Sequence, residues 1–154
     1  MAVEHSTLTT TDLHEPKGVA AANADEVYVA DGAASGAWTA HDNFAYLTLQ
    51  IDDISSASSS WVAAPTAGNI TKIYTIINAV IASGDATITA EINTVAVTNS
   101  SITIAYSGSA VGDVDSSTPS AARTVAAGDK IEIITNGGST NTCKAVVTIV
   151  IVPT

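Results

Sequence analysis

Three histidines, His5, His14 and His41, are the side chains of this sequence best suited to act as a catalytic base. All three lie within the first 43 residues, apart from the regular pattern that follows, so a serine in the body has no predicted base beside it. The segment Gly108–Gly112 places its serine one position too early for the G-x-S-x-G turn that exposes a nucleophile. No segment has the spacing of a phosphate-binding glycine loop. The sequence therefore predicts no catalytic residues, and we expect a protein that is not an enzyme.

Two pairs of carboxylates in predicted loops, Asp52–Asp53 and Asp113–Asp115, offer the oxygen ligands that calcium prefers. Neither pair is followed by the spacing of an EF-hand, and acidic side chains in turns commonly hydrogen-bond to the backbone. Glu91 and Glu132, the glutamates of the C-terminal part, are expected on solvent-facing positions of strands, which disfavours a hydrolase with two carboxylates flanking a cleft. We therefore predict no metal and no cofactor.

Large apolar side chains are the candidates for binding a partner, because aromatic residues supply much of the burial energy of an interface. Val27, Tyr28 and Trp38 lie in the N-terminal part, and Trp61 follows a serine-rich segment that is expected to be a loop. These four residues are predicted to anchor the chain to a protein partner. A tryptophan in a loop of a β-sandwich also suits the flat face of a sugar, so carbohydrate binding remains the alternative.

The composition favours strands over helices. Hydrophobic residues make up 46% of the chain, aromatic residues only 5% and charged residues 13%, while valine, isoleucine, threonine, serine and alanine are abundant. The strongest helix formers apart from alanine, such as leucine, glutamate, lysine and methionine, are scarce. β-branched side chains suit the half-buried surface of a pleated sheet. An all-β protein is therefore expected.

Period-two alternation of apolar and polar residues locates the strands after residue 43. Some runs alternate, some are apolar on both faces, and some are short. Together they give about eight strands: 45–51, 70–81, 86–93, 95–98, 102–106, 123–125, 130–133 and 143–152. Segments 70–81 and 143–152 are apolar on both faces, which indicates the centre of a sheet or a subunit interface. Turn clusters such as 55–60 and 108–119 separate the runs. Residues 44–154 are predicted to form an antiparallel β-sandwich, jelly-roll-like in strand number.

Residues 1–43 differ in character from this body. They carry seven acids against one lysine, and their apolar residues are mostly single alanines and valines, too few for a core. Only Glu26–Ala30 has the pattern of a short strand. We expect an extended N-terminal arm that becomes ordered against a partner.

The charge of the chain excludes several classes of partner. Fifteen acidic residues against five basic ones give a formal net charge of −10, and the basic residues are scattered along the sequence. Binding to nucleic acid or to an anionic membrane needs clustered lysine and arginine, so neither is expected. The N-terminus has no basic and apolar signal segment, no apolar run approaches the roughly 20 residues of a membrane span, and the single cysteine, Cys143, fits a reducing cytoplasm.

The arm resembles the N-terminal segment of virion proteins of tailed bacteriophages, especially head-fibre and capsid-decoration proteins. The residues that carry this resemblance are His14–Gly18, Asn23–Gly32 and Gly36–Trp38. The body is similar to the jelly-roll domains of capsid cement proteins in the strand after Gly84–Asp85, in Val125–Ile133 and in Ala145–Ile149.

The resemblance implies a structural role on the outer surface of a bacteriophage head. Such proteins bind the major capsid protein as homo-oligomers, with a trimer favoured over a dimer, and reinforce the joints between capsomers. The N-terminal arm is the expected attachment element, and the expected location is the outer capsid surface of a virion assembled in the host cytoplasm. The alternative is a tail or fibre adhesin domain that binds carbohydrate of the host surface.

Overall fold

The computed structural model describes residues 23, 26–30, 36–40 and 43–154, and the chain separates into two units, residues 1–42 and 43–154. The first unit contains a hairpin and the second contains ten strands. In chain order the strands are β1 Glu26–Ala30, β2 Gly36–Ala40, β3 Ala45–Ile51, β4 Ser58–Ala63, β5 Gly68–Ile77, β6 Ala86–Ile92, β7 Val95–Ala96, β8 Ile102–Ile104, β9 Val114–Ser117, β10 Thr124–Val125, β11 Lys130–Thr135 and β12 Ala145–Pro153.

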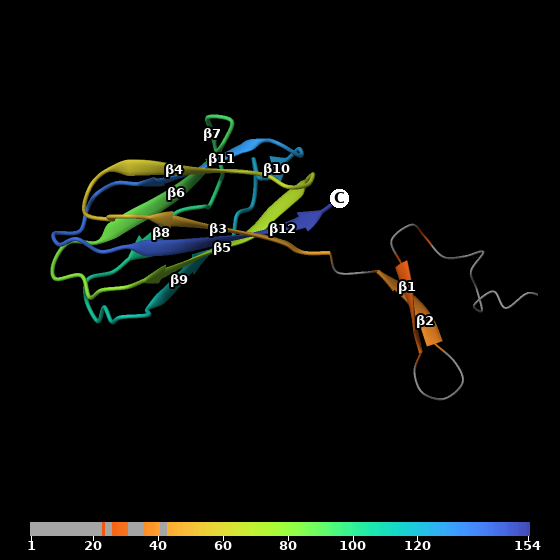
Figure 1. Ribbon diagram of the computed structural model, residues 1–154, viewed down its shortest axis with the longest axis horizontal. Coiled ribbons are helices and arrows are strands. Elements are labelled where there is room, and N and C mark those ends of the chain that lie inside the picture. Colours follow the sequence, from red (N-terminus) through yellow and green to blue (C-terminus); the bar gives the residue numbers. More distant parts are fainter. Residues whose placement is uncertain (1–22, 24–25, 31–35, 41–42) are drawn as a thin grey trace, which may run out of the picture. The chain divides into compact units, whose positions relative to one another are not determined.

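Residues 43–154 form an all-β sandwich of two antiparallel sheets (Figure 1). One sheet, which we call the β12 sheet, has the order β3, β12, β5, and then β9 and β10, which pair one after the other with different parts of the far edge of β5. The other, the β11 sheet, has the order β4, β11, β6, and then β7 and β8 along the far edge of β6. Every pairing between strands is antiparallel.

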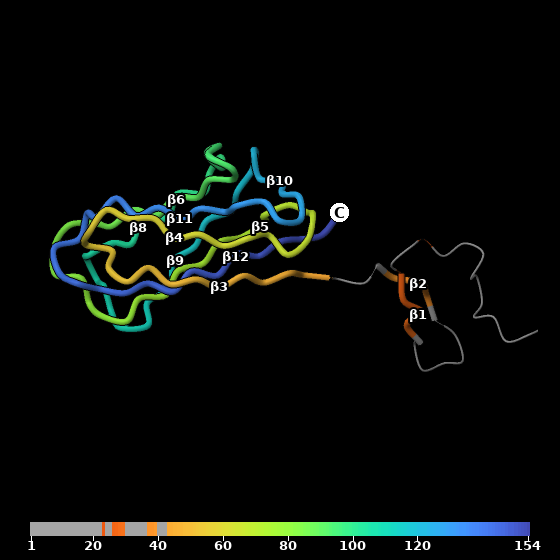
Figure 2. The backbone as a smooth tube through the Cα atoms, turned by 45° about the horizontal axis from the view of Figure 1, so that its top comes forward, coloured from red at the N-terminus to blue at the C-terminus, as the bar shows by residue number. Residues whose placement is uncertain are grey.

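The path of the chain between these sheets is that of a jelly roll. The eight longer strands are ordered β3-β12-β5-β9 in one sheet and β4-β11-β6-β8 in the other, and most connections cross from sheet to sheet at the ends of the sandwich (Figure 2). This arrangement of two four-stranded sheets is the double Greek key of jelly rolls. The predicted fold class is confirmed.

The core between the sheets consists mainly of isoleucine. Alternate positions of β6 are buried, as are Ile131 and Ile133 of β11, because successive side chains of a strand point to opposite faces. In β5 the buried residues Ile70 and Ile73 are three apart, since a β-bulge opposite Val150 and Ile151 of β12 inserts one residue there. The bulge explains why the sequence of β5 shows no simple alternation.

In the second unit the set of strands differs from the prediction in two places. Ser58–Ala63 forms β4 and Val114–Ser117 forms β9, although both lie in segments predicted to be largely turns. Trp61 therefore lies on strand β4, together with the last serines of the segment that was expected to be a loop. The physical reason is pairing: β4 lies beside β11 over six residue pairs and β9 beside β5 over four, which outweighs the low strand preference of serine.

The loops at one end of the sandwich are held by an acidic side chain. The Asp53 carboxylate accepts hydrogen bonds from the Ser55 backbone and hydroxyl at 2.9 and 2.7 Å, from the Cys143 backbone at 3.3 Å and from the Thr142 hydroxyl at 3.4 Å. The Ser55 bonds are the main cause of a pKa below the usual value for this carboxyl. Asp53 thus ties the loop after β3 to the segment before β12.

The first unit has a two-stranded antiparallel hairpin in which β1 pairs with β2 over its whole length. Glu26–Ala30 is a strand, as predicted, and its partner Gly36–Ala40 was not anticipated by the sequence analysis. Tyr28 lies directly opposite Trp38, and their rings meet edge to face with centroids 5.4 Å apart. The remaining parts of the predicted arm lie outside the described residues.

Candidate interaction surfaces

The outer face of the β12 sheet exposes large apolar side chains beside uncharged polar ones. Its side chains, in rows across the strands, include Gln50, Val146, Ile76 and Val114 in one row and Thr48, Thr148, Tyr74 and Ser116 in the next. Ile76 and Val114 are 42% and 58% exposed, and Tyr74 is also exposed. Apolar side chains at neighbouring positions of a sheet form one continuous exposed patch. Such patches, unlike single exposed apolar side chains, mark interaction sites.

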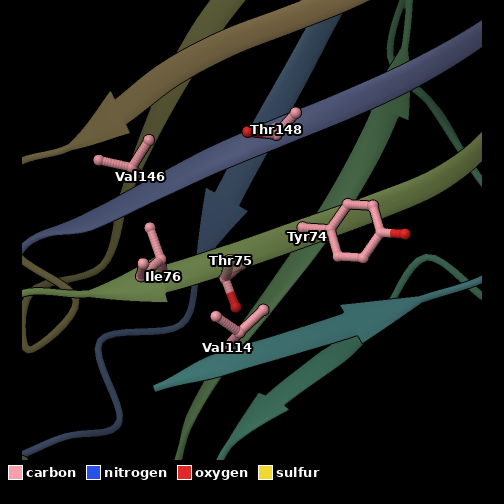
Figure 3. Close-up of a pocket in the computed structure, with 6 residues that line it drawn as sticks. All are labelled: Tyr74, Thr75, Ile76, Val114, Val146 and Thr148. Carbon is pink, nitrogen blue, oxygen red and sulfur yellow. The ribbon is translucent and has the colours of Figure 1, made fainter. Parts of the chain in front are cut away.

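A shallow depression of about 250 Å³ lies in this face (Figure 3). Tyr74, Thr75 and Ile76 of β5 form its floor together with Val146 and Thr148 of β12, and Val114 of β9 lies at its edge. The Thr75 side chain is buried and points to the core side of the sheet, where its hydroxyl has no hydrogen-bond partner among the described residues. None of the residues that line the depression is charged.

The same face carries almost no charge, although the chain as a whole is strongly acidic. Lys72 is its one charged side chain in the described strands, and its ammonium lies 3.0 Å from the Thr118 hydroxyl and 5.7 Å from the centre of the Tyr74 ring. Asp115 is the one acid in these strands, but it is in register with the buried Thr75 and so lies on the opposite face. Burial and the neighbouring Asp113 raise the pKa of Asp115.

The hairpin of the first unit offers a second apolar surface. Val27 and Val29 are 41% and 51% exposed and lie on one face of β1, while Tyr28 lies on the other face, in contact with Trp38. A two-stranded hairpin has marginal stability in water without a surface to pack against. Its exposed valines therefore favour docking onto a partner.

A third surface, on the outer face of the β11 sheet, contains Trp61. The registers of β4, β11 and β6 place Trp61, Glu132 and Glu91 in one row across three adjacent strands. The Trp61 side chain is 57% exposed. Hydrogen bonds from the Ser59 hydroxyl and the Trp61 indole, with the Lys130 ammonium 3.6 Å away, lower the pKa of Glu132 and keep this carboxylate ionised.

The four predicted partner-binding residues are divided between the two units. Tyr28 and Trp38 are direct neighbours, Val27 lies on the other face of the same hairpin, and Trp61 belongs to the second unit. Their role in binding stays a prediction. The sequence analysis did not single out Ile76 or Val114, although the two-sided apolar pattern of residues 70–81 was a signal that β5 exposes apolar side chains.

The groups considered for chemistry are dispersed. His5, His14 and His41 lie outside the described residues. Within the described part of the chain, no three His, Cys, Asp or Glu side chains converge as metal ligands, and no helix is long and apolar enough to cross a membrane. Cys143 is buried, and its thiol lies 3.3 Å from the backbone oxygen of Ala79.

Comparison with known proteins gives no match: no family model, no curated protein and no solved structure matches this chain.

Proposed function

We propose that this chain is a structural protein of a bacteriophage virion, a capsid decoration protein that binds the major capsid protein on the outer surface of the head and stabilises the joints between capsomers. The observation that carries the proposal is the outer face of the β12 sheet, which exposes Ile76, Val114 and Tyr74 and carries few charges on a chain with a formal net charge of −10. A protein that works by association needs a surface of this kind, whereas catalysis needs convergent polar groups.

The two apolar surfaces suit two different contacts. Copies of this chain repel one another through their acidic surfaces, so they approach most favourably through the face of the β12 sheet, whose strands carry no exposed carboxylate. The exposed Asp52 at the end of this face is paired with Lys144 at 3.6 Å. The hairpin, with Val27 and Val29 exposed, is then free to bind the capsid. We expect a homo-oligomer, with a trimer favoured, because several attached arms raise the avidity of a weak single contact.

Binding to heads tests the proposal. Heads of the encoding phage, assembled without this protein, are mixed with the full chain and sedimented. The wild-type chain should pellet with the heads and saturate at many copies per head. A chain that stays in the supernatant at every concentration would refute the assignment.

The attachment element is tested with the double variant Val27→Asp/Val29→Asp. Placing two carboxylates on the docking face should reduce head binding by about tenfold or more, since burying an unpaired charge at an interface is costly. Val111→Asp, an equally drastic change at an exposed loop position of the second unit, is the matched control and should bind normally. Equal binding by the double variant would show that another surface attaches the protein.

A further inference from the structure

The row formed by Trp61, Glu132 and Glu91 is not needed for association through the β12 sheet, because it lies on the outer face of the other sheet. Neighbouring strands are about 4.8 Å apart, so the row extends over roughly 10 Å from β4 to β6. It presents a flat aromatic ring at one end and a carboxylate at the other.

The indole ring lies beside Glu132 in the row, and most of its surface stays open to solvent. Glu132 is itself largely covered, with a side-chain exposure of 15%. Trp61 remains 57% exposed and has a large apolar surface to bury against a ligand. A ring on a strand of a rigid sheet offers a flat platform on which a ligand can stack.

Glu91 supplies a hydrogen-bond acceptor beside this platform. It lies directly opposite Glu132 on the neighbouring strand, and like charges in such a pair oppose the sheet. Within the described residues Glu91 accepts no hydrogen bond and forms no ion pair, in contrast to Glu132. Its carboxylate is therefore available to hydroxyl or ammonium donors of a ligand, which would also relieve the repulsion.

We propose that this row is a binding site for a pyranoside, with one apolar face of the sugar ring stacked on Trp61 and its hydroxyl or amino groups donating to Glu91. A sugar combines a flat apolar face with donors at its edge, which matches the order of groups along the row. Two carboxylates favour neutral or amino sugars and repel uronic acids. This proposal does not rest on the proposed capsid role, because sugar binding is measured with the purified chain in the absence of heads.

Titration of the ¹⁵N-labelled full chain followed by NMR tests this site. The probes are chitotetraose, its deacetylated cationic form, cellotetraose and, as an anionic sugar, trigalacturonic acid. At least one of the first three should shift the Trp61 indole N–H signal and the amides around Glu91, whereas trigalacturonic acid should shift neither. No shift with any neutral or cationic probe, or shifts with the anionic one, would overturn the proposal.

Variants distinguish specific binding at this row from nonspecific binding of sugar to exposed aromatic side chains. Trp61→Ala should weaken binding of the active probe by about tenfold or more, and Glu91→Ala, which removes a like-charge contact and should fold well, by several-fold. Tyr106→Ala removes another exposed aromatic side chain outside the row and should bind as the wild type does. Unchanged affinity in Glu91→Ala, or an equal loss in Tyr106→Ala, would contradict the assignment.

Discussion

Two buried threonines, one in each sheet, differ in whether the side-chain hydroxyl has a hydrogen-bond partner, and this difference decides whether the hydroxyl stabilises or destabilises the fold. Thr75 in β5 and Thr135 in β11 are both almost fully buried. The Thr135 hydroxyl lies 3.4 Å from the Ile54 carbonyl and accepts from the Gly137 backbone at 3.3 Å, whereas the Thr75 hydroxyl has no partner among the described residues. A buried polar group without a partner costs free energy that a methyl group of the same shape avoids.

Thr75→Val should therefore stabilise the protein by about 1 kcal/mol, because valine keeps the branched shape and removes the unsatisfied hydroxyl. Thr135→Val is the matched control and should destabilise it by about 1–2 kcal/mol, since two polar backbone groups lose their partner. Chemical denaturation of both variants measures the free energies of unfolding. A loss of stability in Thr75→Val would mean that its hydroxyl is satisfied in solution.

The strands differ in how much of them the sequence predicts. Apolar residues at alternate positions, alanine and isoleucine in β6 and isoleucine in β11, identify these strands and their buried faces, because the core fixes that pattern. β4 and β9 were missed since serine favours turns locally, and only pairing with strands distant in sequence makes them strands. The same limit applies to the site: Trp61 was found as a candidate by its type, but its alignment with Glu132 and Glu91 depends on the register.

The outer face of the β12 sheet makes a prediction about association. At micromolar concentration the wild-type chain should show a mass above the 15.5 kDa of one copy in size-exclusion chromatography with light scattering. The double variant Ile76→Asp/Val114→Asp should shift the mass toward that of a monomer. Each copy would bring two new carboxylates to the interface, so at least four like charges would face one another between two copies.

Val95→Asp, at an equally exposed valine of the β11 sheet, should leave the mass unchanged, and thermal unfolding of each variant controls for folding. A wild-type chain that stays monomeric, or a Val95→Asp variant that dissociates as readily as the double variant, would contradict association through the β12 sheet.

At the scale of the whole molecule, the net charge and the exposed apolar side chains have opposite effects on contact between copies. A net charge of −10 opposes contact between copies, whereas the exposed apolar side chains of the β12 sheet and of the hairpin favour contact. The isoleucine core of the jelly roll stabilises the second unit without a disulfide, since Cys143 is the single cysteine. These properties suit a protein that acts in many copies on a large symmetric surface.

Electron cryo-microscopy of heads with and without this protein tests the proposed role most directly. The account predicts jelly-roll-shaped density on the outer surface at symmetry-related positions of wild-type heads, which disappears when the gene is deleted and returns when the purified chain is added. Identical maps of both kinds of head would contradict it.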